Sequence, residues 1–282
     1  MKRIGFIGTE NSHTDHFIRL LNKEERHPGY RATALVGGES ERNKTLAEAG
    51  DISTIVETPE DLIGLVDAAV ICTRDGARHR EQAEPLLKAG LPVLMDKPFA
   101  TTPADAQAVI AAAQASSTPL DSSSALRFVP EIAEFAAARE SLRELRRLTV
   151  AGPADPDSEY SGLFFYGIHH VEAALEILGN PVIAEDQQVD VVRRGDTTTA
   201  RTLIGDVEVE FVFVVPGDGF RVPFHAYLVG TGGIEAKELT LGGDYNAPLL
   251  AKFVNVWETG QAIDVDRLTS PVNLLSAIAA AL

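Results

Sequence analysis

Short apolar runs alternate with segments of helical spacing through the first 122 residues, and this alternation limits the possible folds more than any other feature. Runs of this length, bounded by glycine, proline or polar residues, are typical of buried parallel strands. The sequence predicts strands at 2–7, 31–36, 53–56, 68–72, 93–97 and 119–122. Because helices separate these strands, we expect an α/β fold with a doubly wound parallel sheet and right-handed crossovers.

The chain has 282 residues, which is more than a single domain usually holds. The hydrophobic period changes to that of strands in the second half, where 207–213 alternates and Gly205-Asp206 forms a two-residue hairpin turn. We therefore predict two domains, 1–124 and 125–282, of which the second is an α+β domain with an open, mostly antiparallel sheet.

The charge of the chain excludes some partners. With 41 acidic and 25 basic residues the net charge is -16, so we expect no nucleic acid and no membrane surface as a partner. Cys72 is the single cysteine and lies in an apolar run, which indicates a buried thiol and a reducing compartment. No apolar run approaches the roughly 18 residues of a membrane span, and we expect a cytoplasmic protein.

Asp96 and Lys97 end the predicted strand 93–97, at the edge where open parallel sheets bind their ligands. Pro98 keeps Lys97 out of the helical conformation, so the backbone sets the direction of the lysine. For so short a motif, the alternative is an ordinary surface lysine at a strand end. Polar residues also follow the preceding strand at the same edge: Thr73, Arg74 and His79.

A glycine turn joins the first strand to the first helix, and the free amides and dipole of a helix start favour an anion there. In the dinucleotide pattern G-x-G-x-x-G, Gly8 takes the first position, but Glu10 and His13 replace the other two glycines. The motif alone fits a nucleotide site and a plain connection equally well. The residues expected at this site are Gly8, Thr9, Glu10, Ser12 and His13, with Ser12 as the candidate helix cap.

His13, Asp15 and His16 form a cluster of possible metal ligands. We predict no metal site, because no further strong ligand lies nearby in the sequence.

The end of the second strand is where such sheets usually carry an acid for the adenosine ribose hydroxyls. Gly37 takes that place here. Ser40 and Arg42 are candidates for a 2′-phosphate, whereas Glu39 or Glu41 are candidates for the ribose. The choice between NAD and NADP therefore stays open.

Three stretches together resemble the glucose-fructose oxidoreductase and inositol dehydrogenase family, called Gfo/Idh/MocA. They are Val66–Thr73 continuing through His79 to Asp96-Lys97-Pro98, then Leu126-Arg127-Phe128-Val129-Pro130, and Gly167-Ile168-His169-His170-Val171-Glu172. Their order and spacing match the family's E-K-P, interdomain link and G-x-H-x-x-D motifs, over most of the chain.

The resemblance implies a Rossmann dinucleotide-binding domain at 1–124 with a nicotinamide cofactor, NAD or NADP. It implies a domain for substrate binding and oligomerisation at 125–282, with a sugar, inositol or related polyol as substrate and hydride transfer between the two. Lys97 would bind the reacting oxygen and His169 would act as general acid and base. Other expected substrate contacts are Arg127, Tyr160, Tyr166 and His170. Beyond the first turn and the end of the second strand, the expected cofactor contacts are Thr73, Arg74, His79, Asp96 and Lys97. The family associates through its open sheet, so a homodimer or homotetramer is expected.

The sequence departs from the family pattern near the histidine. Phe165 stands where the family often places an aspartate, four residues before His169, while Glu172 replaces a later aspartate. The acid lost at Phe165 and the two lost glycines favour an alternative, a non-catalytic dinucleotide- or sugar-binding protein on the same fold.

Overall fold

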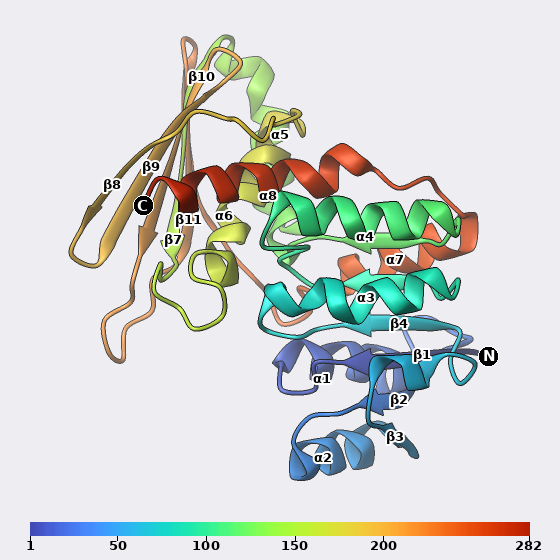
Figure 1. Ribbon diagram of the computed structural model, residues 1–282. Coiled ribbons are helices and arrows are strands. Elements are labelled where there is room, and N and C mark those ends of the chain that lie inside the picture. The colour runs from blue at the N-terminus through green and yellow to red at the C-terminus, as the bar shows by residue number, and fades with distance from the viewer. The chain divides into compact units, whose positions relative to one another are not determined.

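The computed structural model describes residues 1–282, which divide into two units (Figure 1). Unit 1 contains Met1–Ala100, Ala104–Ser123 and Asn246–Val265, and unit 2 contains Thr101–Pro103, Ser124–Tyr245 and Asp266–Leu282. The prediction placed everything after residue 124 in the second domain. The difference arises because helix α7 (Ala247–Thr259) packs on the last strand of unit 1, where the Lys252 ammonium pairs with Asp121 at 2.6 Å.

Unit 1 is built on six parallel strands in the order β3-β2-β1-β4-β5-β6. Their bounds are β1 Lys2–Ile7, β2 Tyr30–Val36, β3 Thr54–Val56, β4 Ala68–Ile71, β5 Val93–Met95 and β6 Leu120–Ser122. The predicted doubly wound sheet is confirmed. The strand order reverses between β1 and β4, and a sheet of this kind binds ligands outside the carboxyl ends at that point.

Unit 1 contains five α-helices. They are α1 Ser12–Ile18, α2 Ser40–Gly50, α3 His79–Lys88, α4 Pro103–Ala115 and α7, with a π-helical turn at Arg19–Lys23. Asn11 rather than Ser12 caps α1, because its side-chain oxygen accepts the N–H of His13. Between β3 and β4 the chain forms a single 3₁₀ turn, Pro59–Leu62.

Unit 2 contains an open sheet in the order β12-β11-β7-β10-β9-β8, in which only β7 and β10 pair in parallel. The strands are β7 Leu145–Pro153, β8 Asp190–Arg194, β9 Thr197–Ile204, β10 Val207–Val214, β11 Phe224–Gly230 and β12 Gly233–Leu239. The helices are α5 Pro130–Leu142, α6 Phe164–Leu178 and α8 Val265–Ala280. The mostly antiparallel sheet is confirmed. The sequence did not predict β8, an exposed edge strand, or α5, which buries only three side chains.

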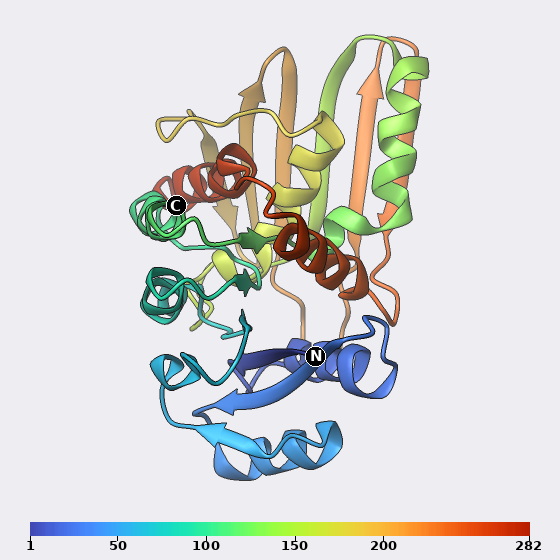
Figure 2. The ribbon, with the colours of Figure 1, turned by 90° about the vertical axis from the view of Figure 1, so that its right-hand side faces the viewer.

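Helices α5 and α6 cover one face of this sheet, and the other face carries no helix (Figures 1 and 2). Along β10 the side chains of Val209, Phe211 and Phe213 are buried toward the helices. The two-residue turn Gly205-Asp206 joins β9 to β10 as predicted. No helix in either unit combines the length and apolar character that crossing a membrane requires.

The first turn approaches β4 closely at Gly8, and Gly90 is a comparison with a similar φ but no close neighbour. Gly8 has φ +84°, and an added Cβ would lie 2.1 Å from the backbone nitrogen of Thr73; Gly90 has φ +79° and open space around it. We expect Gly90→Ala to cost about 1 to 2 kcal/mol of unfolding free energy from the left-handed backbone alone. Gly8→Ala adds an overpacking cost of about 1 to 3 kcal/mol. Urea unfolding measures both, and equal losses in the two variants contradict the close approach.

Candidate functional site

A pocket of about 410 Å³ opens in unit 1 at the carboxyl ends of β1 to β4, where the strand order reverses. Five of the residues predicted to bind a cofactor line it: Gly8, Thr9, Glu10, Gly37 and Thr73. The remaining lining includes residues that the sequence analysis did not select: Gly38, Glu57, Thr58, Glu60, Arg78, Glu81 and Gln82. Of these, Glu57 directly follows β3, so the rule that found Asp96 after β5 would also have found it.

The first turn of the pocket is closed by hydrogen bonds to one carbonyl. The carbonyl of Gly8 accepts from the Asn11 N–H at 3.2 Å and from the Thr14 hydroxyl at 2.9 Å. Thr9 is buried, and its hydroxyl oxygen has no hydrogen-bond partner in the protein although the residue lines the pocket. Since buried polar atoms nearly always have a hydrogen-bond partner, the unpartnered Thr9 hydroxyl is evidence that a polar ligand binds in this pocket.

Asp96 is a buried carboxylate at the end of β5, with 1% of its surface exposed. Its oxygen lies 2.7 Å from Nδ1 of His13 and 3.5 Å from the side-chain nitrogen of Asn11. Burial by itself raises the pKa of Asp96, but the charge and hydrogen bond of His13, together with the Lys97 ammonium, lower that pKa to about 2. Asp96 is therefore ionised at neutral pH, beside Lys97, which is itself 5% exposed.

His79, Arg74 and Thr73 hold the β4 rim of the pocket. The Nε2 of His79 lies 2.8 Å from the carbonyl oxygen of Thr73, and burial lowers the pKa of this histidine. The Thr73 hydroxyl donates to the Gln82 side chain at 2.8 Å. Arg74 donates its backbone N–H to the Glu10 carboxylate at 3.0 Å and a guanidinium N–H to the Glu10 carbonyl at 2.9 Å. Both fingerprint replacements, Glu10 and His13, thus have partners within unit 1.

Eight of the residues predicted to bind a cofactor do not line the pocket: His13, Arg74, His79, Asp96 and Lys97, whose places are given above, and Ser12, Ser40 and Arg42. Arg42 donates to the Thr9 carbonyl at 2.9 Å and pairs with Asp15. Ser12 and Ser40 are exposed first residues of α1 and α2.

In unit 2, α6 positions His169, which is 5% exposed. The hydroxyl of Ser124 lies 2.6 Å from its Nδ1, and the rings of Tyr166 and Phe224 lie at 5.7 and 5.5 Å between centroids. A hydroxyl can donate or accept, so Ser124 can bind the imidazole in its neutral and its protonated form. Ser124 is not among the residues predicted for the site, although it closely follows β6.

Arg127 is buried and binds carboxylates rather than facing a cavity. It pairs with Glu172, and with Glu176 at 2.7 Å, while Glu172 also accepts the backbone N–H of Ser124 at 2.7 Å. Burial by itself lowers the pKa of Arg127, but these carboxylates raise it overall. Through Glu172, Arg127 therefore holds the backbone at Ser124 in place. Because its guanidinium is used in these ion pairs, a direct contact between Arg127 and the substrate is not favoured.

An aromatic cluster occupies the position of the family aspartate. The Phe165 ring lies 4.9 Å from that of Tyr160 and 5.0 Å from that of Tyr166 between centroids. Phe165 and Tyr166 also line a second pocket, of about 460 Å³, together with Pro153, Pro216 and Phe220 among others. Asp155, Ser158 and Arg221 line this pocket as well, so its lining combines aromatic and polar side chains.

His170 lies inside the unit 2 core, with no exposed surface. Its ring contacts those of Phe213 and Phe224 at 4.9 and 5.2 Å between centroids. Burial lowers its pKa to about 4, so it is neutral at pH 7. This placement does not favour a substrate contact.

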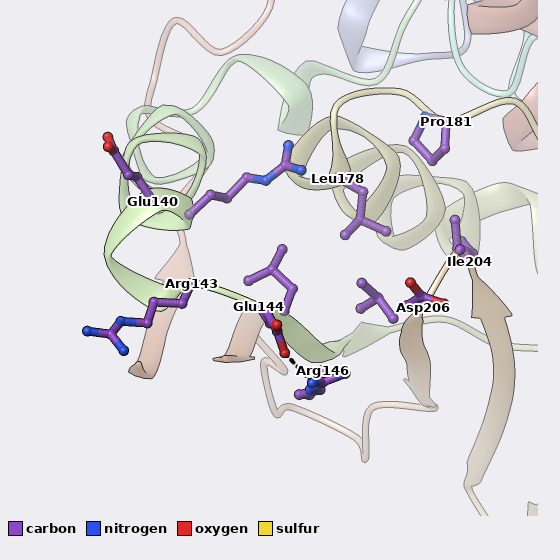
Figure 3. A pocket seen from close by; sticks show the side chains of 12 residues that line it. Glu140, Arg143, Glu144, Arg146, Leu178, Pro181, Ile204 and Asp206 are labelled. Carbon is purple, nitrogen blue, oxygen red and sulfur yellow. Dashed lines mark hydrogen bonds and ion pairs between the residues drawn. The ribbon is translucent and has the colours of Figure 1, made fainter. Parts of the chain in front are cut away.

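A larger pocket, of about 850 Å³, lies between the end of α5, the start of β7 and the β9–β10 turn (Figure 3). Figure 3 shows Glu144 paired with Arg146 at its margin. None of the predicted site residues lines this pocket, and it is not the candidate site.

Comparison with known proteins agrees with this geometry. The model of the Gfo/Idh/MocA oxidoreductase family, described as an NAD-binding Rossmann fold, matches residues 2–121. Inositol 2-dehydrogenase 2 of Saccharopolyspora erythraea is 30% identical over 239 residues, which are 78% of this chain and 68% of that protein. Inositol 2-dehydrogenase 1 of the same organism is 37% identical over 112 residues, but the match covers only 39% of this chain and 32% of the relative's length.

Solved structures share the fold across nearly the whole chain. GenD2 from gentamicin A biosynthesis, in complex with NAD, has a TM-score of 0.83 at 18% identity and covers 99% of this chain and 93% of its own. Apo scyllo-inositol dehydrogenase from Lactobacillus casei has a TM-score of 0.81 at 14% identity, with coverage of 100% and 96%.

The fold and the matches define an oxidoreductase class with an NAD-binding Rossmann domain. Within that class, the chain belongs to the Gfo/Idh/MocA family.

The burial of His170 predicts a pH dependence of stability. The unfolded chain takes up a proton near pH 6.5, whereas the folded chain takes it up only near pH 4, so stability falls as the pH drops from 6.5 toward 4. In this window we expect His170→Gln to reduce the pH slope of the unfolding free energy by about 1.4 kcal/mol per pH unit. Urea unfolding at several pH values measures the slope, and an unchanged slope in the variant contradicts the neutral, buried imidazole.

Proposed function

We propose that this protein is an NAD(P)-dependent oxidoreductase that transfers a hydride between a nicotinamide cofactor and a hydroxyl or carbonyl carbon of a sugar, inositol or related polyol. The observation that supports this most is the ionised Asp96 and adjacent Lys97 at the same sheet edge as a pocket of about 410 Å³. The similarity to inositol 2-dehydrogenases supports the substrate class.

The residues of the unit 1 pocket fit a dinucleotide. The Gly8 turn is closed and narrow, and the Thr9 hydroxyl, buried without a partner, supplies a polar contact. Thr9, Thr73 and the start of α1 would hold the cofactor. When bound, the cofactor accepts or supplies the hydride.

Lys97 binds the reacting oxygen in this proposal. As a carbinol is oxidised, negative charge builds up on its oxygen while the hydroxyl proton leaves, and a nearby ammonium stabilises that charge. The charge of Lys97 in turn helps to lower the pKa of the neighbouring Asp96 carboxyl.

His169 takes the hydroxyl proton, or returns it in the reverse direction. An imidazole has an ordinary pKa of about 6.5, which suits proton exchange near neutral pH. Ser124 fixes the orientation of the ring through Nδ1.

The bare face of the unit 2 sheet supports association into a homodimer or homotetramer, which we include in the proposal. Exposed apolar side chains on this sheet include Val192, Leu203 and Tyr227. The buried carboxylate of Glu210 forms ion pairs with Arg147 and Arg201 at 2.6 and 2.7 Å. Apolar groups with satisfied charges between them are typical of interfaces between copies.

Replacing Lys97 tests the central role. We expect Lys97→Ala to lower kcat with a polyol by about 1,000-fold or more, as removal of one stabiliser of transition-state charge usually does, while NADH binding stays within a few fold. Lys88→Ala is the control, since Lys88 is exposed at the end of α3 and pairs with Glu84. Steady-state kinetics and NADH fluorescence give the two readouts. Turnover that survives in Lys97→Ala removes this residue from the mechanism; cofactor binding without any turnover in the wild type supports the non-catalytic alternative.

Replacing Phe165 tests the proton path. A carboxylate one helical turn before His169 would raise the pKa of the imidazole. We therefore expect Phe165→Asp to shift the pH optimum of kcat or to increase turnover, whereas Phe165→Leu should do neither. The pH profile of kcat measures this. Identical profiles for the Asp and Leu variants would argue against His169 as the acid and base.

A further inference from the structure

We propose that Glu57 binds the adenosine ribose hydroxyls of the cofactor and makes the site select NAD over NADP. This inference rests on the proposed function.

The backbone at the end of β2 disfavours the usual acid. Gly37 and Gly38 have φ values of +50° and +84°, which L side chains adopt rarely. A Cβ added at Gly38 would lie 2.5 Å from the hydroxyl oxygen of Thr9. A carboxylate for the ribose must therefore come from a neighbouring element.

Glu57 is that neighbour. Strands β2 and β3 pair Val36 with Val56, and the Gly37 N–H donates to the Val56 carbonyl at 2.7 Å. Glu57 therefore leaves β3 beside Gly37, and it lines the same pocket as Gly37, Gly38 and Thr9.

The charges of the pocket favour hydroxyls over a phosphate. Its lining carries four carboxylates, Glu10, Glu57, Glu60 and Glu81, and one guanidinium, Arg78, which pairs with Glu81 at 3.2 Å. A 2′-phosphate would meet net negative charge, whereas ribose hydroxyls can donate to a carboxylate in charge-assisted hydrogen bonds.

Arg42, the basic residue predicted as a candidate for binding a 2′-phosphate, has other partners. Arg42 donates to the Thr9 carbonyl at 2.9 Å and pairs with Asp15, and it does not line the pocket. Glu10, likewise, accepts the Arg74 N–H at 3.0 Å. Glu57 follows β3 beside Gly37, lines the pocket, and has no part in these bonds.

The test is equilibrium binding of NADH and NADPH to the full chain, measured by titration calorimetry with the wild type, Glu57→Gln and Glu39→Gln. We expect the wild type to bind NADH at least about tenfold more tightly than NADPH. Glu57→Gln should weaken NADH binding by about tenfold or more, the usual worth of a hydrogen bond to a charged group, and should leave NADPH binding unchanged or tighter.

Glu39→Gln is the matched control. It removes the same charge from the residue before α2, which does not line the pocket, so the ratio of the two dissociation constants should not change. Glu57→Gln with an unaltered ratio, an equal change in Glu39→Gln, or a wild type that prefers NADPH would each overturn the inference alone. A wild type that binds neither nucleotide overturns the proposed function with it.

Discussion

The buried carboxylate of Asp96 is the interaction on which the rest of unit 1 depends. An ionised group without water is stable only when charges and hydrogen bonds surround it. His13 and Asn11 supply these from the start of α1, and the Asn11 amide also donates to the Cys72 carbonyl at 2.7 Å. The backbone N–H of Asp96 donates to the Ile71 carbonyl at 2.8 Å. One residue thus ties the ends of β4 and β5 to the first helix, and it fixes the backbone that carries Lys97.

This arrangement explains why Glu10 and His13 replace the second and third glycines of the G-x-G-x-x-G pattern. A glycine at position 13 would leave Asp96 without its imidazole partner, and a glycine at position 10 would remove the carboxylate that accepts the Arg74 N–H. The side chains of Glu10 and His13 therefore stabilise the carboxyl edge of the sheet through hydrogen bonds that glycines could not make. The first glycine cannot be replaced in this way, because β4 leaves no space for a side chain at Gly8.

The sequence predicted the parallel sheet and its carboxyl edge, since both follow from the period of apolar residues and from polar residues at strand ends. It did not predict what depends on contacts between distant segments. The return of α7 to unit 1 rests on pairs such as Lys252 with Asp121, 131 residues apart. Ser124 became a candidate only when the fold placed it beside His169. Glu57 follows a predicted strand, but only the fold showed that it leaves β3 beside Gly37. The aromatic cluster around Phe165 gave no signal of its own, because an aromatic residue in an apolar helix looks like core.

The account depends most on the claim that the edge formed by the Gly8 turn and the Asp96-Lys97 end of β5 holds a nicotinamide dinucleotide. A crystal structure of the protein grown with NAD tests it directly. The account predicts the pyrophosphate at the turn between Gly8 and His13, and the nicotinamide ring at the Asp96-Lys97 end of the sheet. A dinucleotide bound elsewhere, or an empty edge at a saturating NAD concentration, would contradict it.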